Sequence, residues 1–210
     1  MTAEPPMAPE GAHRLFGERL PRAETFAAIL ADTGVSHGLI GPREVDILWE
    51  RHILNCAVIE DSFPTGSRVI DVGAGAGLPG LALAIARPDL ELHLVEPMLR
   101  RTEWLTEAIA DLGLANASVH RGRAEEVHGN LSAPWVTARA VARIDKLARW
   151  CFPLLDPEGT LVAIKGRSAP EELAKAEKVL RRLGMVRARV TEHGVGVVSE
   201  PTRTLDCRVT

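Results

Sequence analysis

The sequence has few cysteines, no long apolar run and little lysine. Its 3 cysteines, Cys56, Cys151 and Cys207, are widely spaced and form no C-x-x-C pair, which argues against a disulfide framework or a zinc knuckle. No apolar run approaches the roughly 20 residues that cross a bilayer. The first ten residues are rich in proline and acid, whereas a secretion signal begins basic and continues apolar. We therefore expect a cytoplasmic protein that does not contact a membrane.

Metal ligands and basic charge are also scarce. The 7 histidines show no paired ligand spacing, so we expect no metal site. The net charge of -3 argues against a polyanionic partner when taken alone. The charge is uneven, however, because residues 1–64 carry 5 arginines against 10 acids, whereas residues 165–210 carry 10 basic residues against 6 acids. Only 4 of the 25 basic residues are lysine, and arginine is the better residue for bidentate phosphate contacts.

The chain has the length and composition of one globular domain with an appendage. It has 210 residues, of which 46% are hydrophobic and 25% charged. We expect residues 1–10 to be a disordered tail and residues 11–64 to form a helical cap. Helices are predicted at 23–32 and from Pro42 onward, because proline is tolerated in a first turn and apolar residues from Val45 to Cys56 follow at helical spacing.

Residues 65–210 alternate short apolar runs with helical segments. Strands are predicted at 68–72, 90–96, 117–120, 135–138, 160–165, 185–192 and 204–209, and helices at 79–87, 98–112, 144–155 and 171–183. Alternation of this kind predicts an α/β fold, with a mostly parallel sheet covered by helices on both faces. The last two strands have no helix between them, which predicts an antiparallel edge.

A glycine-rich loop joins the first strand to the following helix. Residues 69–80 read Val-Ile-Asp-Val-Gly-Ala-Gly-Ala-Gly-Leu-Pro-Gly. Glycines let the backbone approach a ligand closely, and the free N–H groups at a helix start favour an anionic group. Gly75, Gly77 and Gly80 also satisfy the dinucleotide pattern G-x-G-x-x-G, so the loop alone leaves the cofactor open. A turn kept only for packing is the structural alternative.

Two acids narrow the choice of cofactor. Asp71 precedes Gly73 by two residues, where a carboxylate would repel a diphosphate. The same carboxylate suits the ammonium and sulfonium groups of S-adenosylmethionine. Glu96 ends the second strand, where an acid accepts both ribose hydroxyls of an adenosine cofactor, NAD included. Asp71 therefore favours S-adenosylmethionine, whereas Glu96 supports an adenosine cofactor without choosing between the two.

The other strand ends are expected to open onto one crevice, because ligands of open parallel sheets bind beyond the carboxyl ends of the strands. Residues 71–78, Glu96, residues 123–125, Arg139 and residues 165–166 lie at these ends. Ala124 and Glu125 are placed to meet an adenine through a backbone N–H and a carboxylate, with helix capping as the alternative for Glu125. Arg139 is expected to clamp a carboxylate or phosphate, or else to pair with an acid of the crevice.

Several motifs together resemble one family. They are the 71–80 loop with its Leu-Pro-Gly ending, Gly-Arg-Ala-Glu at 122–125, Ala-Arg-Ala at 138–140, Lys-Gly at 165–166, and the helical stretch 50–55. Over residues 11–209 the chain resembles the bacterial small-subunit ribosomal RNA guanine-N7 methyltransferases, the glucose-inhibited division protein B family. The resemblance implies a Rossmann-like methyltransferase fold and S-adenosylmethionine as methyl donor. It also implies one guanine of 16S ribosomal RNA as acceptor, in free RNA or in the small ribosomal subunit.

The resemblance also implies site residues. By matching position, the cofactor contacts are Gly73, Leu78, Ala124, Glu125 and Arg139, to which the reasoning above adds Asp71, Gly75, Gly77 and Glu96. The candidates for RNA contacts are Arg101, Arg123, Lys165 and Arg167, with a solvated charged surface as the alternative.

Guanine N7 is an unprotonated acceptor, so no catalytic acid or base is predicted, and Arg139 is the nearest candidate. We expect a monomer. Two alternatives stay open: a methyltransferase that acts on a small molecule or a protein, and a non-catalytic module that binds an adenosine nucleotide.

Overall fold

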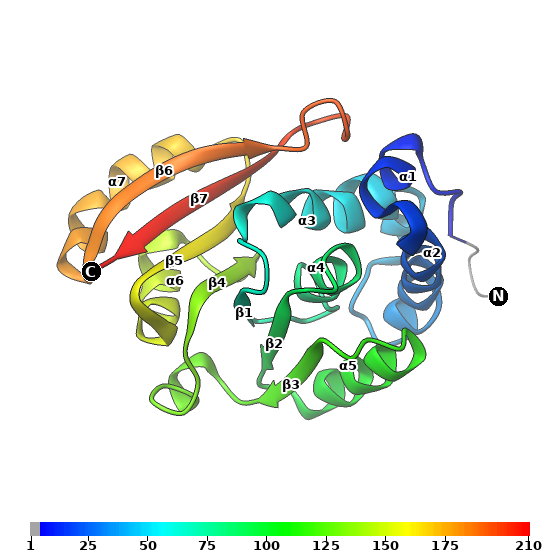
Figure 1. Cartoon of the computed structure of the whole chain (residues 1–210), viewed down its shortest axis with the longest axis horizontal. Helices are drawn as coiled ribbons and strands as arrows, with labels where there is room; N and C mark the ends of the chain where they lie inside the picture. The colour runs from blue at the N-terminus through cyan, green and yellow to red at the C-terminus, as the bar shows by residue number, and fades with distance from the viewer. Residues whose placement is uncertain (1–4) are drawn as a thin grey trace.

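The computed structural model describes residues 5–210, which form a seven-stranded sheet with helices on both faces (Figure 1). Residues 1–4 of the predicted tail lie outside the described residues. Residues 5–9 form no helix or strand, but the carbonyl of Pro6 accepts a hydrogen bond from the indole of Trp49 at 2.9 Å. Helix α1 (Glu10–Phe16) begins at the last residue of that tail. Within the described residues no helix is long and apolar enough to cross a membrane.

The N-terminal region is helical, as predicted, but irregular. After α1 come a 3-10 turn (Gly17–Arg19), α2 (Leu20–Ile29) and a π-helical turn (Leu30–Gly34). The second stretch consists of η3 (Pro42–Ile47), a 3-10 helix; η4 (Leu48–Leu54), a π-helix; α3 (Asn55–Ala57); and η5 (Val58–Ser62), a 3-10 helix. Pro42 occupies the first turn of η3, where a missing N–H costs no hydrogen bond.

The sheet has the predicted mixture of parallel and antiparallel strands. Its strands are β1 (Arg68–Val72), β2 (Glu91–Glu96), β3 (Ala117–Arg121), β4 (Ala133–Arg139), β5 (Leu155–Lys165), β6 (Met185–His193) and β7 (Thr202–Val209). They lie in the order β3-β2-β1-β4-β5-β7-β6. Strands β1 to β5 pair in parallel, whereas β7 pairs antiparallel with both β5 and β6. The predicted antiparallel edge is therefore confirmed.

Helices cover both faces because successive strand side chains point to opposite sides. Val69 packs with α4 (Gly80–Ala86), α5 (Leu99–Asp111) and the N-terminal helices. Its neighbours Ile70 and Val72 pack with α6 (Ile144–Cys151) and α7 (Ala169–Arg182) on the other face. In Figure 1 the N-terminal helices lie beside α4, at the end of the molecule opposite β6 and α7. One apolar core thus joins the N-terminal helices to the sheet.

The largest departure from the predicted elements lies between α6 and β5. The predicted helix 144–155 ends at Cys151, followed by a 3-10 turn (Phe152–Leu154) that contains Pro153, and β5 begins at Leu155 rather than at residue 160. The register of β4 against β5 shifts between Ala133 and Trp135. Residues 156–159, which read Asp-Pro-Glu-Gly, resemble a turn but form an irregularity inside a strand.

Candidate functional site

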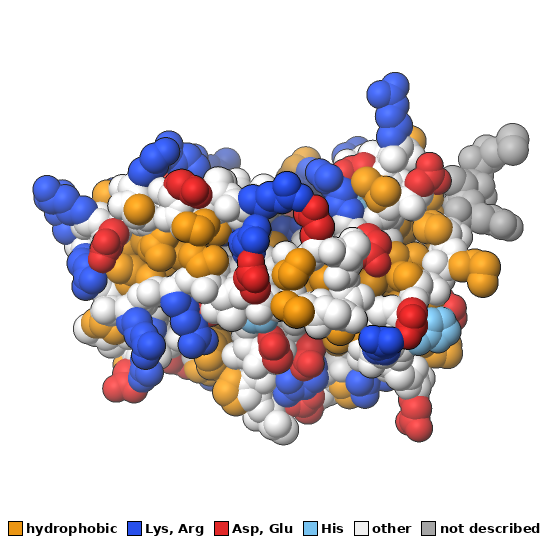
Figure 2. All heavy atoms as spheres, turned by 90° about the horizontal axis from the view of Figure 1, so that it is seen from above, with side chains coloured by type: hydrophobic (Ala, Val, Ile, Leu, Met, Phe, Trp, Pro, Cys, Tyr) orange, Lys and Arg blue, Asp and Glu red, His pale blue; other side chains and the backbone are white. Residues whose placement is uncertain are grey.

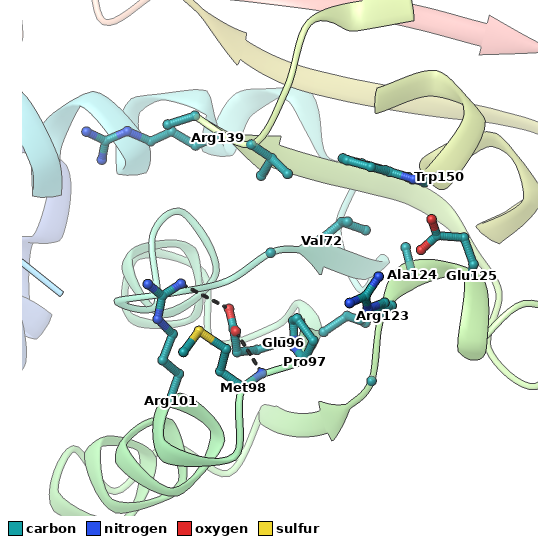
Figure 3. Close-up of a pocket in the computed structure, with 15 residues that line it drawn as sticks. Val72, Glu96, Pro97, Met98, Arg101, Arg123, Ala124, Glu125, Arg139 and Trp150 are labelled. Carbon is teal, nitrogen blue, oxygen red and sulfur yellow. Dashed lines mark hydrogen bonds and ion pairs between the residues drawn. The ribbon is translucent and has the colours of Figure 1, made fainter. Parts of the chain in front are cut away.

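A cavity of about 380 Å³ lies at the carboxyl ends of β1, β2 and β4 and beside the segment that follows β3 (Figure 3). Five of the predicted cofactor residues line it, and so do two of the predicted RNA contacts. The seven are Gly73, Glu96, Ala124, Glu125, Arg139, Arg101 and Arg123. This edge of the sheet is where ligands of α/β folds bind.

Glu96 is held rigidly at the floor of the cavity. Its side chain is buried, Oε2 accepts a hydrogen bond from the N–H of Gly75 at 3.1 Å, and Oε1 accepts one from Met98 at 3.0 Å. The guanidinium of Arg101 lies 3.9 Å from Oε2 (Figure 3). A carboxylate oxygen has two lone pairs, so each can still accept a hydroxyl proton. Gly75 therefore acts on the site through Glu96, although it does not line the cavity.

Gly73 brings two loops into close contact. Its φ of 75° lies in the left-handed region, and its N–H donates to the carbonyl of Val95 at 2.8 Å. A Cβ at this position would lie 2.9 Å from Cγ2 of Val141, on the loop that follows β4. Val141 itself lines the cavity. The sequence shows no motif at Val141, so its part in the site was not predicted.

Two of the other predicted loop residues shape the turn and do not line the cavity. Gly77 has a φ of 74°, and a Cβ there would lie 2.4 Å from Cδ1 of Leu81 in α4. Leu78 is 7% exposed and belongs to the core that α4 shares with the N-terminal helices. These two residues fix the start of α4, and a direct contact with a cofactor stays a prediction.

Asp71 is fully buried beneath the loop and does not line the cavity. Its Oδ2 accepts a hydrogen bond from the N–H of Gly80 at 2.8 Å, at the first residue of α4. Its Oδ1 has no partner among residues 5–210. Burial raises the pKa of Asp71 to about 7; the charge of Glu96 raises it further, while the bond from Gly80 and the charge of Arg139 oppose the rise. Asp71 thus caps α4, and the predicted contact with an ammonium group remains untested.

Arg139 lines the cavity, but its guanidinium points to the N-terminal helices (Figure 3). Nη2 donates to the carbonyl of Arg51 and contacts Nδ1 of His52, each at 3.0 Å, while Nη1 contacts Sγ of Cys56 at 3.0 Å. Within residues 5–210 the guanidinium forms no ion pair with an acid of the crevice, and the predicted clamp on a bound anion stays a prediction. Burial, and next the charge of Arg139, lower the pKa of His52 to about 4. A neutral His52 can accept the proton that Arg139 donates.

Trp150 of α6 forms a wall that was missed in the sequence, where it reads as an ordinary helix residue. Figure 3 shows its indole beside Glu125. The Nζ of Lys146 lies 4.9 Å from the centroid of the indole, and the carbonyl of Trp150 accepts a hydrogen bond from Nε2 of His128 at 2.9 Å. The indole thus offers an aromatic surface to a flat ligand in the cavity.

The strand ends that are predicted to share one crevice line two adjoining cavities. Lys165 and Gly166 line a second cavity of about 640 Å³, which shares Arg139 and Ala140 with the first. The Nζ of Lys165 donates to the carbonyl of Ala142 at 2.7 Å and to Oε1 of Glu172 at 2.9 Å. The segment from Arg139 to Ala142 is thus a wall between the two cavities. Arg167, the remaining predicted RNA contact, is paired with Glu200.

The fold defines the class of protein. Solved structures with this fold include a SAM-dependent methyltransferase from Aquifex aeolicus, with 18% identity and a TM-score of 0.58, covering 85% of this chain and 98% of that one. TYW2 from M. jannaschii, solved in complex with AdoMet, has 17% identity and a TM-score of 0.59 and covers 78% of each chain. The fold is that of the S-adenosylmethionine-dependent methyltransferases.

The sequence comparisons define the family within that class. The model of the GidB family, rRNA small subunit methyltransferase G, matches residues 19–198. A relative from Pseudarthrobacter chlorophenolicus is 55% identical over 191 residues, which cover 91% of this chain and 88% of the relative. One from Salinispora tropica is 52% identical over 209 residues, covering 96% and 86%. Both are named Ribosomal RNA small subunit methyltransferase G, and this chain belongs to their family. The predicted family and methyl donor are confirmed.

Proposed function

We propose that this protein transfers a methyl group from S-adenosylmethionine to N7 of one guanine in 16S ribosomal RNA. Membership of the rRNA small subunit methyltransferase G family supports the RNA acceptor. The observation that carries the proposal is the cavity at the carboxyl edge of a methyltransferase sheet, with the buried carboxylate of Glu96 fixed by two backbone N–H groups.

The residues of the cavity fit the methyl donor. Glu96 offers carboxylate oxygens for ribose hydroxyls, and Trp150 with Glu125 offers an aromatic surface and an acceptor for an adenine amino group. Gly73 leaves the space that a Cβ would fill beside Val141. When bound, S-adenosylmethionine supplies a methyl group on a positively charged sulfur. The cavity volume of about 380 Å³ lies within the range of small-molecule sites.

The chain supplies alignment rather than acid–base chemistry in this proposal. Guanine N7 carries a lone pair and no proton, so direct in-line attack on the methyl group needs no general base. A covalent route through cysteine is disfavoured because burial raises the pKa of the Cys207 thiol to about 12 and raises that of Cys151 still more. Alignment of reacting atoms can lower a barrier by about 7–11 kcal/mol in well-oriented systems.

Basic side chains near the cavities are proposed to contact RNA phosphates. Arg101 and Arg123 line the first cavity, and Arg167 lies beside the second. Lys165 lines the second cavity and is paired with Glu172, so its proposed contact is with the RNA base rather than with a phosphate. Figure 2 shows further basic side chains gathered over the left part of the molecule, where Figure 1 places α7 and β6. Because arginine and lysine neutralise phosphates, RNA binding should weaken steeply as the salt concentration rises.

A methylation assay tests the proposal. Purified protein, labelled S-adenosylmethionine and small ribosomal subunits that lack the modification should yield N7-methylguanosine after digestion of the RNA. The Glu96→Gln variant should lose activity because an amide cannot accept both backbone protons, whereas Glu107→Gln, on the exposed side of α5, should retain it. Label on another atom, or no label, contradicts the proposal.

An acceptor panel separates this proposal from a methyltransferase of small molecules or proteins. Transfer to a small molecule or a protein, with none to ribosomal RNA, would favour that alternative. Calorimetry separates the proposal from a non-catalytic nucleotide-binding module, because S-adenosylmethionine should bind and NAD should not.

A further inference from the structure

The second cavity is larger than the first and adjoins it. It lies between the ends of β4 and β5 on one side and η4 with residues 199–200 on the other. Its volume is about 640 Å³, and it shares the wall formed by Arg139 and Ala140 with the first cavity. A group held there would meet the methyl donor across the end of that wall.

We propose that this second cavity receives the acceptor guanine and that Glu50 and Asn55 read its hydrogen-bond donors. The inference rests on the proposed function, since it takes guanine as the acceptor. Guanine differs from adenine in having two donors side by side, the N1–H and the 2-amino group. A protein reads them with groups that only accept, such as a carboxylate or an amide oxygen.

Glu50 lies at the wall of the cavity with one oxygen engaged. Its Oε2 accepts hydrogen bonds from the N–H of Ser199 at 3.2 Å and from Oγ of Ser199 at 3.0 Å. Among residues 5–210, Oε1 has no hydrogen-bond partner. The bonds to Ser199 hold the carboxylate in place and leave Oε1 as an acceptor for a ligand.

The hydrogen bonds of Asn55 show which terminal atom of its side chain is the amide nitrogen and which is the oxygen. The hydroxyl of Thr202 donates to the main-chain carbonyl of Asn55 at 3.0 Å, so Oγ1 of Thr202 can only accept from the side chain of Asn55, at 2.8 Å. The atom that contacts Thr202 must therefore be Nδ2, a donor. This leaves Oδ1 as a second acceptor in a residue that lines the cavity.

Other residues that line the second cavity can contact the faces and the carbonyl group of a guanine base. Ile47, which is 44% exposed, lines the cavity together with Ile164. These two side chains offer apolar contact to the faces of a base. The Nζ of Lys165 has one N–H left after its bonds to Ala142 and Glu172, and it can donate to the guanine carbonyl O6.

Adenine fits the hydrogen-bond acceptors of Glu50 and Asn55 poorly. Its N1 accepts where guanine N1 donates, and it has no 2-amino group, so the acceptors of Glu50 and Asn55 would face an acceptor or nothing. A site built to hydrogen-bond a substrate group rejects an analogue that lacks the group, by up to about 10⁴- to 10⁵-fold. For inosine, which lacks only the 2-amino group, we expect a loss of about tenfold or more.

The test compares two RNAs that carry either guanine or inosine at the mapped acceptor position. Wild-type protein should methylate the guanine RNA at least about tenfold faster in kcat/KM. Glu50→Gln should slow the guanine RNA and lose most of the preference, because the amide nitrogen would face the donors of the base. Its affinity for S-adenosylmethionine, measured by calorimetry, should be unchanged, which shows that the protein is folded and the first cavity intact. Glu24→Gln, on the exposed side of α2, is the matched control.

The outcomes separate this inference from the proposed function. If wild-type protein methylates guanine N7 but Glu50→Gln keeps both the rate and the preference for guanine, the reading of the base by Glu50 is overturned and the function stands. If wild-type protein modifies no guanine, the proposed function fails and this inference fails with it. Asn55→Asp, which keeps an acceptor at Oδ1, should retain more of the preference than Asn55→Ala.

Discussion

Nη2 of Arg139 lies 3.0 Å from Nδ1 of His52, and this contact joins the end of β4 to η4. The same guanidinium also contacts the carbonyl of Arg51 and the sulfur of Cys56, so one side chain connects the sheet to the N-terminal helices at the wall of both cavities. The depressed pKa of His52, about 4, keeps the imidazole neutral at physiological pH and therefore able to accept from Arg139.

Replacing Arg139 should loosen this connection. Arg139→Ala leaves the carbonyl of Arg51 and Nδ1 of His52 without their partner, and we expect a loss of about 1–3 kcal/mol in the free energy of unfolding. Urea denaturation followed by circular dichroism measures it. Arg149→Ala, which removes an exposed arginine from α6, is the control and should change the stability little.

The same variant tests the cofactor contact predicted for Arg139. A loss of affinity for S-adenosylmethionine of about tenfold or more would indicate that the guanidinium reaches the ligand when the site is filled. Unchanged stability together with unchanged affinity would contradict both roles.

Crowding at Gly73 should block the first cavity. In Gly73→Ala the new methyl group would lie 2.9 Å from Cγ2 of Val141, so the loop that follows β4 must move. We expect the affinity for S-adenosylmethionine to fall by at least about tenfold, with a further cost of about 1–2 kcal/mol in stability from the left-handed backbone. Calorimetry and urea denaturation measure the two effects.

Gly66 provides a matched control for Gly73. Its φ is 73°, close to the 75° of Gly73, but nothing lies within 4 Å of a Cβ at that position. Gly66→Ala should therefore show the backbone cost without the loss of affinity. Equal affinities in the two variants would show that the contact with Val141 does not matter for the cofactor.

The buried carboxyl of Asp71 should make stability depend on pH. Its pKa is raised from the ordinary 3.8 to about 7 in the folded protein, so the folded state holds the proton more tightly than the unfolded state. The resulting contribution is fully present below about pH 4 and is lost as the pH rises through 7. Asp71→Asn keeps an acceptor for the N–H of Gly80, and its stability should exceed that of the wild type increasingly between pH 4 and 7, by up to a few kcal/mol.

The pH dependence due to Asp71 is best measured as the difference in free energy of unfolding between Asp71→Asn and the wild type. His52, with its pKa lowered from 6.5 to about 4, has the opposite sign, because its contribution is lost as the pH falls through that range. Subtracting the free energy of unfolding of the wild type from that of Asp71→Asn at each pH cancels the contribution of His52. A difference that does not vary with pH would contradict the raised pKa, and a strongly weakened affinity for S-adenosylmethionine would support the ammonium contact predicted from the sequence.

Trp150 should report cofactor binding by fluorescence. It lines the first cavity, whereas Trp49 and Trp104 are buried in the core and Trp135 packs edge-on against Phe63. We expect the emission to change when S-adenosylmethionine binds, and Trp150→Phe to remove most of that change. Trp135→Phe should retain it. A change that persists in Trp150→Phe would place the adenine elsewhere.

Much of the fold could be predicted because its signals are local. The strand at 68–72, the glycine loop and the helix after it depend on apolar runs, turn residues and the position of Pro79, all within residues 68–86. The irregular helices η3 and η4 could not be predicted in detail, because their apolar spacing resembles that of an α-helix. The start of β5 was missed since Asp156 and Pro157 read as a turn.

The parts of the site that were missed depend on contacts between distant segments. Arg139 bonds to Cys56 across 83 residues, and only the packing of the N-terminal helices on the end of β4 brings the two together. Outside the site, His93 and His120 form a hydrogen bond at 2.9 Å for the same kind of reason, because β2 and β3 are neighbours in the sheet. The ends of parallel strands, by contrast, were a sound guide to Glu96, Ala124 and Glu125.

The wall between the two cavities is anchored at its far end by Glu172. Its Oε1 accepts hydrogen bonds both from Nζ of Lys165 and from the N–H of Ile144, which follows the wall in the chain. A wall tied at both ends cannot yield to a ligand on one side without changing the space on the other. We therefore expect occupancy of the two cavities to be thermodynamically linked, so that any factor by which the methyl donor raises acceptor affinity is the factor by which the acceptor raises affinity for the methyl donor.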